Sequence, residues 1–363
     1  MGLGALPRAT IGTEAKAYYQ GEKSTQVALA RRVAKATLEQ PEPDFYRSGM
    51  SRFDGQSAIA IYQMTLLGLG QVVSAHPELR DEFLPAMRRA AERLVAPQTL
   101  TYAAKVYGQH GVRYMAPGAG HAYLGYINLG LGMLRKFDPE TPLAALHDRL
   151  TRDLAARLFA SPTGLIETYP GETWPPDVAA VAGSIGLHDW AVGRPQRAAM
   201  GKWSQRFREC ALDPTGYLVQ RLVSGGCKRK DAPRGSGTAV SSYFLSFATP
   251  ELSSELFRGL AADGRRSFLG FGAVKEYASG YSGSGDGNAG PIVLGVSVGA
   301  SGFALGAARA HGAEEMFIEG YRTAALFGIP TETSSGVRHA VAGALGDALL
   351  LAMLTALPAE IYR

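Results

Sequence analysis

The sequence is poor in cysteine, tryptophan and charge. Its 363 residues include two cysteines, Cys210 and Cys227, and three tryptophans, and 19% of the residues are charged. Neither cysteine lies in a CxxC motif or at a Cys/His ligand spacing, which argues against a disulfide scaffold and against a zinc module. We expect two unpaired thiols, with a single disulfide between them as the open alternative.

Long apolar runs and targeting signals are also missing. No stretch of about 18 residues lacks polar interruption, the length that a membrane span needs, and residues 1–20 lack the basic-then-apolar order of a signal peptide. We therefore expect a soluble chain without a membrane span, cytoplasmic as given and periplasmic if a leader has been removed.

Positive charge is in modest excess and is not organised for nucleic acid. The net charge is +5, and the one compact basic cluster, Lys228-Arg229-Lys230, lies in a glycine-rich loop. Nucleic-acid binders combine such charge with aromatic residues or a known motif. Neither is found, so we expect no nucleic-acid partner.

Two kinds of predicted helix alternate along the chain. The first kind is charged and carries an apolar stripe at three- and four-residue spacing; it covers 24–39, 78–95, 142–160, 194–211, 251–263 and 313–327. The second kind is apolar on nearly all sides and rich in Gly and Ala; it covers 57–74, 120–134, 177–190, 237–246, 291–310 and 339–357. A helix of the second kind has to be buried on most sides.

Apolar helices that recur at intervals of roughly fifty to sixty residues indicate a structural repeat. We predict an all-α fold, a single (α/α)6 toroid over 1–363 with six inner and six outer helices, preceded by an extension at 1–23. An open solenoid is the alternative, but its last helix would need a polar outer face. The last predicted helix is strongly apolar, which favours closure.

The loops before the inner helices should converge on one mouth, where we predict the catalytic residues Asp54, His121, Tyr169 and Glu172. Asp54 is either an inward catalytic carboxylate or the N-cap of the helix that follows. His121 opens an apolar helix, whose positive end favours the neutral imidazole that a general base needs.

Glu172 stands between Tyr169 and Trp174 in a proline-framed loop. Such an aromatic, water-poor setting favours the protonated acid, which suits a general acid. Asp177 follows two prolines and fits an N-cap. The predicted substrate contacts are Tyr62, Tyr107, Arg113, Trp174, Asp177, Tyr243, Tyr281 and Asp286.

Several catalytic signatures are missing from the chain: a P-loop, a Rossmann glycine fingerprint, a nucleophile elbow and an HExxH motif. We expect a small-molecule substrate, no cofactor and no metal. Homo-oligomerisation stays open.

Three entrance motifs resemble those of the linalool dehydratase/isomerase family: Phe53-Asp54-Gly55, Pro117-Gly118-Ala119-Gly120-His121 and Tyr169-Pro170-Gly171-Glu172. The resemblance implies a cofactor-independent lyase or isomerase that uses acid and base groups for dehydration, hydration or isomerisation of a small, largely apolar alcohol such as a terpenoid. The family pairs cysteines in its active site, whereas Cys210 and Cys227 fall elsewhere in this chain.

The alternative is a carbohydrate-active enzyme on the same fold: a glycoside hydrolase, a polysaccharide lyase or a sugar epimerase with paired carboxylates. Three tryptophans are few for a sugar site, which favours the less polar substrate. A binding scaffold is a third possibility, and the gathering of Tyr, His, Glu and Asp at one mouth favours an enzyme over it.

Overall fold

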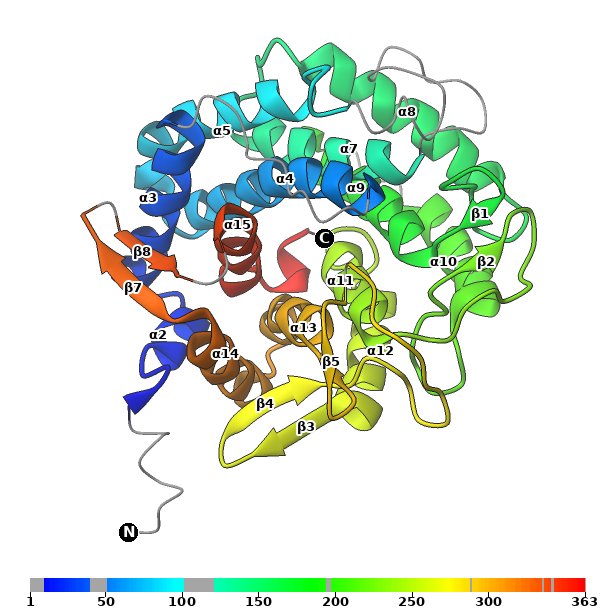
Figure 1. Cartoon of the computed structure of the whole chain (residues 1–363). Helices are drawn as coiled ribbons and strands as arrows, with labels where there is room; N and C mark the ends of the chain where they lie inside the picture. Colours follow the sequence, from blue (N-terminus) through cyan, green and yellow to red (C-terminus); the bar gives the residue numbers. More distant parts are fainter. Residues whose placement is uncertain are drawn as a thin grey trace.

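Two concentric rings of helices make up the structure (Figure 1). The computed structural model describes residues 10–39, 51–100, 121–193, 197–287, 289–334, 336–340 and 343–362. Within these residues the inner ring consists of α4 (Ser51–Ala75), α7 (His121–Phe137), α9 (Pro175–Val192), α11 (Gly235–Leu245), α13 (Val298–Ala310) and α15 (Gly343–Leu354). Each inner helix packs on the next, and α15 packs on α4, so the ring is closed.

The outer ring surrounds the inner one in Figure 1. Its described members are α3 (Lys23–Glu39), α5 (Arg80–Leu94), α8 (Ala144–Ala160), α10 (Arg197–Ala211), α12 (Pro250–Gly259) and α14 (Glu314–Gly328), and the short α2 (Ala15–Gln20) precedes them. In α5 the stripe of Phe83, Met87 and Leu94 is buried. Arg88 and Arg89 on the same helix are about half exposed. The all-α (α/α)6 prediction is confirmed.

Glycines let the inner helices approach one another closely. A Cβ atom at Gly183 of α9 would clash with the carbonyl oxygen of Phe244 in α11, and one at Gly68 of α4 would lie 2.6 Å from Leu351 of α15. Glycine has a low helix propensity. At these positions its cost is offset by close packing between neighbouring helices, which a larger side chain would prevent.

The two ends of the toroid differ in their connections. Inner helices pass to outer helices through short segments such as 138–143 and 311–313, whereas outer helices pass to inner ones through longer segments. The described two-stranded antiparallel sheets all lie in these longer segments. They pair β1 (Glu172–Thr173) with β2 (Leu222–Val223), β3 (Arg265–Phe268) with β4 (Phe271–Val274), β5 (Ile292–Val293) with β6 (Val296–Ser297), and β7 (Pro330–Thr333) with β8 (Gly336–His339).

The C-terminal segment closes the end of the ring opposite to these sheets. Its last turn, η3 (Ala359–Tyr362), lies inside the ring in Figure 1. The Tyr362 ring packs edge-on against Trp190 near the end of α9, with centroids 5.2 Å apart, and against Phe247 just after α11, at 4.8 Å. The centre of the toroid is therefore accessible from the sheet end, which we call the mouth.

Three inner helices begin four or more residues away from their predicted starts. α4 begins at Ser51, so Asp54 lies in its first turn and is not the N-cap. α13 begins at Val298 because Ile292–Ser297 forms the β5–β6 hairpin, and α15 begins at Gly343 because His339 ends β8. Apolar residues in a hairpin and in a buried helix look alike in sequence.

The prediction of two unpaired thiols is wrong. Cys210 at the end of α10 forms a disulfide with Cys227, and their Cα atoms are 5.0 Å apart. Cys227 lies in the turn after β2, where Val223 N–H donates to Lys228 O. The disulfide therefore fixes a mouth segment to an outer helix.

One described segment, Gly55–Ala75 of α4, is long and apolar enough to cross a membrane by length and composition. However, 78% of its most apolar window is buried inside the structure. Neighbouring helices cover an inner helix of a closed ring on most sides, so its residues are mostly apolar. Such a helix therefore passes the same length and composition test.

Replacement of Gly183 with alanine should destabilise the protein by about 1–3 kcal/mol, because the new methyl group overpacks the α9–α11 contact. Urea unfolding measures this change. The control is Gly201→Ala in α10, where an added Cβ meets nothing within 4 Å; it should stabilise by about 0.5–1 kcal/mol. Equal effects of the two substitutions would contradict the packing role of Gly183.

Candidate functional site

A cavity occupies the centre of the inner ring, among the N-terminal halves of its helices. It holds about 1060 Å³ of atom-free space, counting the part open to solvent, and all six inner helices of the described chain contribute to its wall or to the turn just before them. Its polar lining residues are Gln56, Ser57, Gln63, Tyr126, Trp174, Asp177, Gln220 and Ser236. Apolar residues such as Ile59, Val240, Phe244, Phe303 and Leu349 form the rest. A largely apolar cleft with a few convergent polar groups is typical of a small-molecule site.

Asp177 is the one carboxylate among the described residues that line this cavity. α9 begins at Pro175 with Trp174 as its N-cap residue, so Asp177 lies in the first turn and its prediction as N-cap is wrong. It is 7% exposed. The positive N-terminal end of a helix stabilises a nearby negative charge, which favours the ionised carboxylate.

Tyr126 of α7 orients this carboxylate. Its hydroxyl donates to Asp177 Oδ1 over 2.8 Å. Burial, together with the charge of Asp177, raises the pKa of Tyr126 well above its ordinary value. The phenol therefore keeps its proton across the neutral range and remains a hydrogen-bond donor to Asp177.

Two glutamines that line the cavity have buried amide atoms without a hydrogen-bond partner in the described chain. Gln63 is fully buried, and both its Oε1 and its Nε2 are unpartnered; Gln220 is 3% exposed, and its Oε1 is unpartnered. Buried polar atoms in proteins nearly always have a partner, and an unmade bond costs about 1–3 kcal/mol. A ligand that carries hydroxyl groups would satisfy these atoms.

A buried ion-pair network holds the mouth together between α11 and α13. Arg234 Nε donates to Glu276 Oε1 over 2.8 Å, and its Nη1 donates to Asp286 Oδ2 over 2.7 Å. Glu276 is fully buried and also accepts bonds from the hydroxyls of Ser236 and Ser297. Ser297 is the N-cap of α13, and Ser236 lines the cavity. The network therefore sets the position of one cavity wall.

Glu172 and Tyr169 lie beside the cavity and not on its wall. Glu172 Oε1 accepts from Arg221 Nη1 over 3.0 Å, and its Oε2 accepts from Trp174 Nε1 over 3.1 Å. A guanidinium partner favours the ionised carboxylate, so the predicted water-poor setting of a protonated acid is wrong. Tyr169 is buried, packs edge-on against Trp174 and accepts a hydrogen bond from Gln56.

Four predicted substrate contacts point elsewhere. Tyr62 is buried and accepts from Arg93 of the outer helix α5, and Tyr243 is buried in the core, where it donates to Gln71. Tyr281 donates to Asp213, and Asp286 is held by Arg234. None of these four side chains is among the described residues that line the central cavity. Helix rotation and distant partners, which the sequence does not fix, decide these directions.

Trp174 and Asp177 are the predicted substrate contacts that the structure does bring to the cavity wall. Tyr107 and Arg113 lie outside the described residues, as do the side chains of Asp54 and His121. Of the five side chains expected to share one cavity (Asp54, His121, Tyr169, Glu172 and Asp286), the three that are described do not line it.

The residues that sequence reasoning missed are Gln56, Ser57, Gln63, Tyr126, Gln220 and Ser236. Gln56, Ser57, Ala60, Gln63 and Met64 line the cavity at three- and four-residue spacing along α4. Polar residues on one stripe of an otherwise apolar helix were a signal that could have identified this face.

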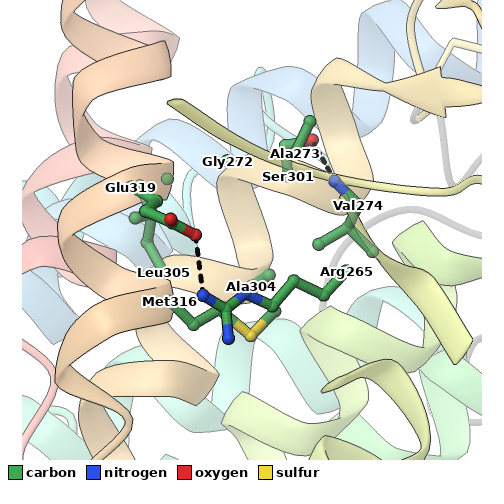
Figure 2. A pocket seen from close by; sticks show the side chains of 10 residues that line it. Arg265, Gly272, Ala273, Val274, Ser301, Ala304, Leu305, Met316 and Glu319 are labelled. Atoms are coloured by element: carbon green, nitrogen blue, oxygen red, sulfur yellow. Dashed lines mark hydrogen bonds and ion pairs between the residues drawn. The ribbon is translucent and has the colours of Figure 1, made fainter. Parts of the chain in front are cut away.

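A second hollow lies between β4, α13 and α14 (Figure 2). Its wall is mainly apolar, with Ala304, Leu305 and Met316, and Arg265 donates to Glu319 across it over 2.9 Å. Ser267 also donates to Glu319. Because these charges pair with each other, the hollow lacks the unpartnered buried groups of the central cavity.

Comparisons with known proteins identify the fold. No protein-family model matches the sequence, and no curated protein matches it. The GH76 α-1,6-mannanase from Salegentibacter sp. HEL1_6 superposes with a TM-score of 0.54 at 11% identity, over 93% of this chain and 100% of that one. The GH76 α-mannanase from Bacteroides thetaiotaomicron superposes with a TM-score of 0.50 at 8% identity, over 83% and 86%.

At these identities the likeness establishes the toroid fold and not the family. The predicted architecture agrees with it, while membership of the linalool dehydratase/isomerase family is not supported. An inactive variant of the Salegentibacter enzyme, with two consecutive aspartates replaced by asparagine, was solved with α-1,6-mannotriose; it superposes with a TM-score of 0.53 at 10% identity, over 93% and 99%. The present sequence contains no two consecutive aspartates.

Replacement of Glu276 with alanine should destabilise the protein by about 3–5 kcal/mol. Arg234 would lose its fully buried partner and keep the partly exposed Asp286, and the hydroxyls of Ser236 and Ser297 would lose their acceptor. Thermal and urea unfolding measure this loss. The control is Asp231→Asn, which alters a partly exposed carboxylate 3.9 Å from Arg234 and should cost under about 1 kcal/mol. Similar losses in both variants would show that the network does not hold the mouth.

Proposed function

We propose that this chain is a carbohydrate-active enzyme that binds a saccharide in the central cavity. The observation that carries the proposal is the set of buried, unpartnered amide atoms (Nε2 and Oε1 of Gln63, Oε1 of Gln220) in one cavity with the oriented carboxylate of Asp177. Amide and carboxylate groups around one cavity match a ligand with several hydroxyl groups. An apolar alcohol with a single hydroxyl would leave most of these groups unsatisfied.

Trp174 supplies an apolar face for a sugar ring. Its indole N–H is held by Glu172, and the Arg221 guanidinium lies 5.5 Å from its ring centroid. Both contacts restrict the rotation of the indole, and a fixed aromatic ring loses little entropy when a ligand packs on it. This is the role in which we place Glu172 and Arg221: they position Trp174.

Asp177 is the proposed catalytic carboxylate. Ionised and held by Tyr126, it suits the base, the nucleophile or the group that stabilises an oxocarbenium-like transition state in glycoside hydrolysis. The proton for the leaving group then comes from a second residue. Asp54, in the first turn of α4, is the sequence-derived candidate for this acid. His121, which opens α7, keeps its predicted role as a base.

The neighbouring structures support this choice over the terpenoid substrate that the sequence favoured. These structures are of α-mannanases, and one holds α-1,6-mannotriose. We therefore place hydrolysis of a saccharide ahead of the predicted lyase or isomerase reaction. The consecutive aspartates of the Salegentibacter enzyme have no counterpart in this sequence. We therefore propose that the catalytic carboxylates of this chain are arranged differently from those two aspartates.

The disulfide bears on where the enzyme works. Disulfides persist in oxidising compartments and are rare in the cytosol. The Cys210–Cys227 bond therefore supports the periplasmic alternative, or another oxidising location, over the cytoplasmic one.

Asp177→Asn should reduce saccharide turnover by about 10²–10⁴-fold, the usual contribution of a positioned acid or base, with little change in thermal unfolding. Product analysis with α-1,6-mannotriose and with a panel of other oligosaccharides measures turnover. The matched control is Glu172→Gln, which also neutralises one carboxylate at the mouth but replaces no residue that lines the cavity. It should retain turnover within about tenfold, because only the orientation of Trp174 is affected.

Three results would contradict the proposal. The first is that the native chain acts on no saccharide and converts a terpenoid alcohol instead. The second is that the Asp177→Asn variant keeps normal saccharide turnover. The third is that the Glu172→Gln variant loses as much turnover as the Asp177→Asn variant.

A further inference from the structure

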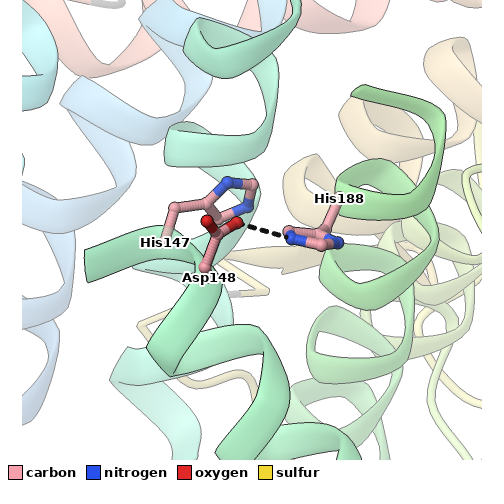
Figure 3. Close-up of side chains that lie close together, drawn as sticks. All are labelled: His147, Asp148 and His188. Carbon is pink, nitrogen blue, oxygen red and sulfur yellow. Dashed lines mark hydrogen bonds and ion pairs between the residues drawn. The ribbon is translucent and has the colours of Figure 1, made fainter. Parts of the chain in front are cut away.

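Three potential metal ligands meet between α8 and α9, far along α9 from the cavity. They are His147 and Asp148 on α8 and His188 on α9, and their ligand atoms all lie within 4.8 Å of one another. Figure 3 shows the three side chains pointing into the space between the two helices. None of them lines the central cavity, and the proposed saccharide chemistry uses none of them.

His147 is a buried imidazole without a partner in the described chain. It is 1% exposed, and neither of its ring nitrogens has a hydrogen bond. A neutral imidazole carries one ring-nitrogen lone pair, and at His147 no described group uses it.

His188 and Asp148 already lie at ligand-like separation. His188 Nε2 is 3.0 Å from Asp148 Oδ1, and the rings of His147 and His188 have centroids 4.8 Å apart. On the other side of the same imidazole, Asp189 Oδ1 lies 3.6 Å from His188 Nδ1. This separation is too long for a hydrogen bond, and His188 Nδ1 has no hydrogen-bond partner in the described chain. Asp189 therefore places a second negative charge beside the ring.

The charge and access of the cluster also suit a cation. Two carboxylates, Asp148 and Asp189, face it, and the guanidinium of Arg135 is the nearby positive group that acts on His147 and Asp148. The Asp148 side chain is 51% exposed, whereas that of His188 is 13% exposed. An ion could therefore enter past Asp148 and reach the buried nitrogens.

We propose that His147, Asp148 and His188 form a binding site for a divalent transition-metal ion, with Zn²⁺ as the best match. Two imidazoles and a carboxylate are ligands that Zn²⁺ prefers, at about 2.0–2.2 Å. The ion would link outer helix α8 to inner helix α9. Its effect would be on stability, because the site lies away from the cavity.

The test is titration of the purified, metal-free whole chain with Zn²⁺ by calorimetry, and with Co²⁺ by visible absorption. The native chain should bind one ion per chain, and saturating Zn²⁺ should raise its unfolding temperature, because an ion bound only by the folded state stabilises it. Asp148→Asn, at an exposed position on α8, should weaken Zn²⁺ binding at least about tenfold, as expected for loss of a ligand. His188→Asn should abolish the intense Co²⁺ absorption of a tetrahedral site.

The matched control is Asp153→Asn, a partly exposed aspartate on the same helix that pairs with Arg152. This variant should bind Zn²⁺ like the native chain. Far-ultraviolet circular dichroism establishes that each variant is folded. The absence of saturable binding to the native chain would overturn the proposal. Equal weakening in Asp148→Asn and Asp153→Asn would also overturn it, since that would indicate non-specific surface binding.

Discussion

Close approach of the six inner helices is the constraint on which the rest of the structure depends. A closed ring requires every inner helix to pack on two neighbours, and the small residues at these contacts make that possible. Gly125 of α7 packs on Val181 of α9, and Gly306 of α13 packs on Met353 of α15. A bulky residue at such a position forces the neighbours apart, which would open the ring and destroy the shape of its cavity.

Ring closure also determines where polar chemistry can be located. The far end is closed by Tyr362, so the polar side chains that can meet a ligand in the central cavity are those near the mouth. There the N-terminal turn of α9 and Tyr126 orient the Asp177 carboxylate, while the buried Arg234–Glu276 pair holds the start of the neighbouring helix α11. The unpartnered amide atoms of Gln63 and Gln220 line the same cavity. The site is therefore built by the fold and not by one continuous motif.

The sequence was sufficient for the architecture because helix periodicity is local. The amphipathic pattern located α3 and α8 to within a few residues, and the Gly/Ala-rich segments identified the inner ring. The same pattern could not separate the β5–β6 hairpin from α13, since both are apolar. It also could not identify Asp177 over Glu172 as the cavity carboxylate. Arg221, which pairs with Glu172, is 49 residues away in sequence, and no local pattern indicates that contact.

The central claim is that this cavity recognises a saccharide through Asp177, Gln63 and Gln220. The most direct measurement is a crystal structure of the Asp177→Asn variant soaked in α-1,6-mannotriose, with a parallel soak in a terpenoid alcohol. The account predicts sugar density in the central cavity, with hydroxyl groups bonded to the amides of Gln63 and Gln220 and a ring packed on Trp174. Sugar bound elsewhere, or the terpenoid alcohol alone in the cavity with both amides still unpartnered, would contradict it.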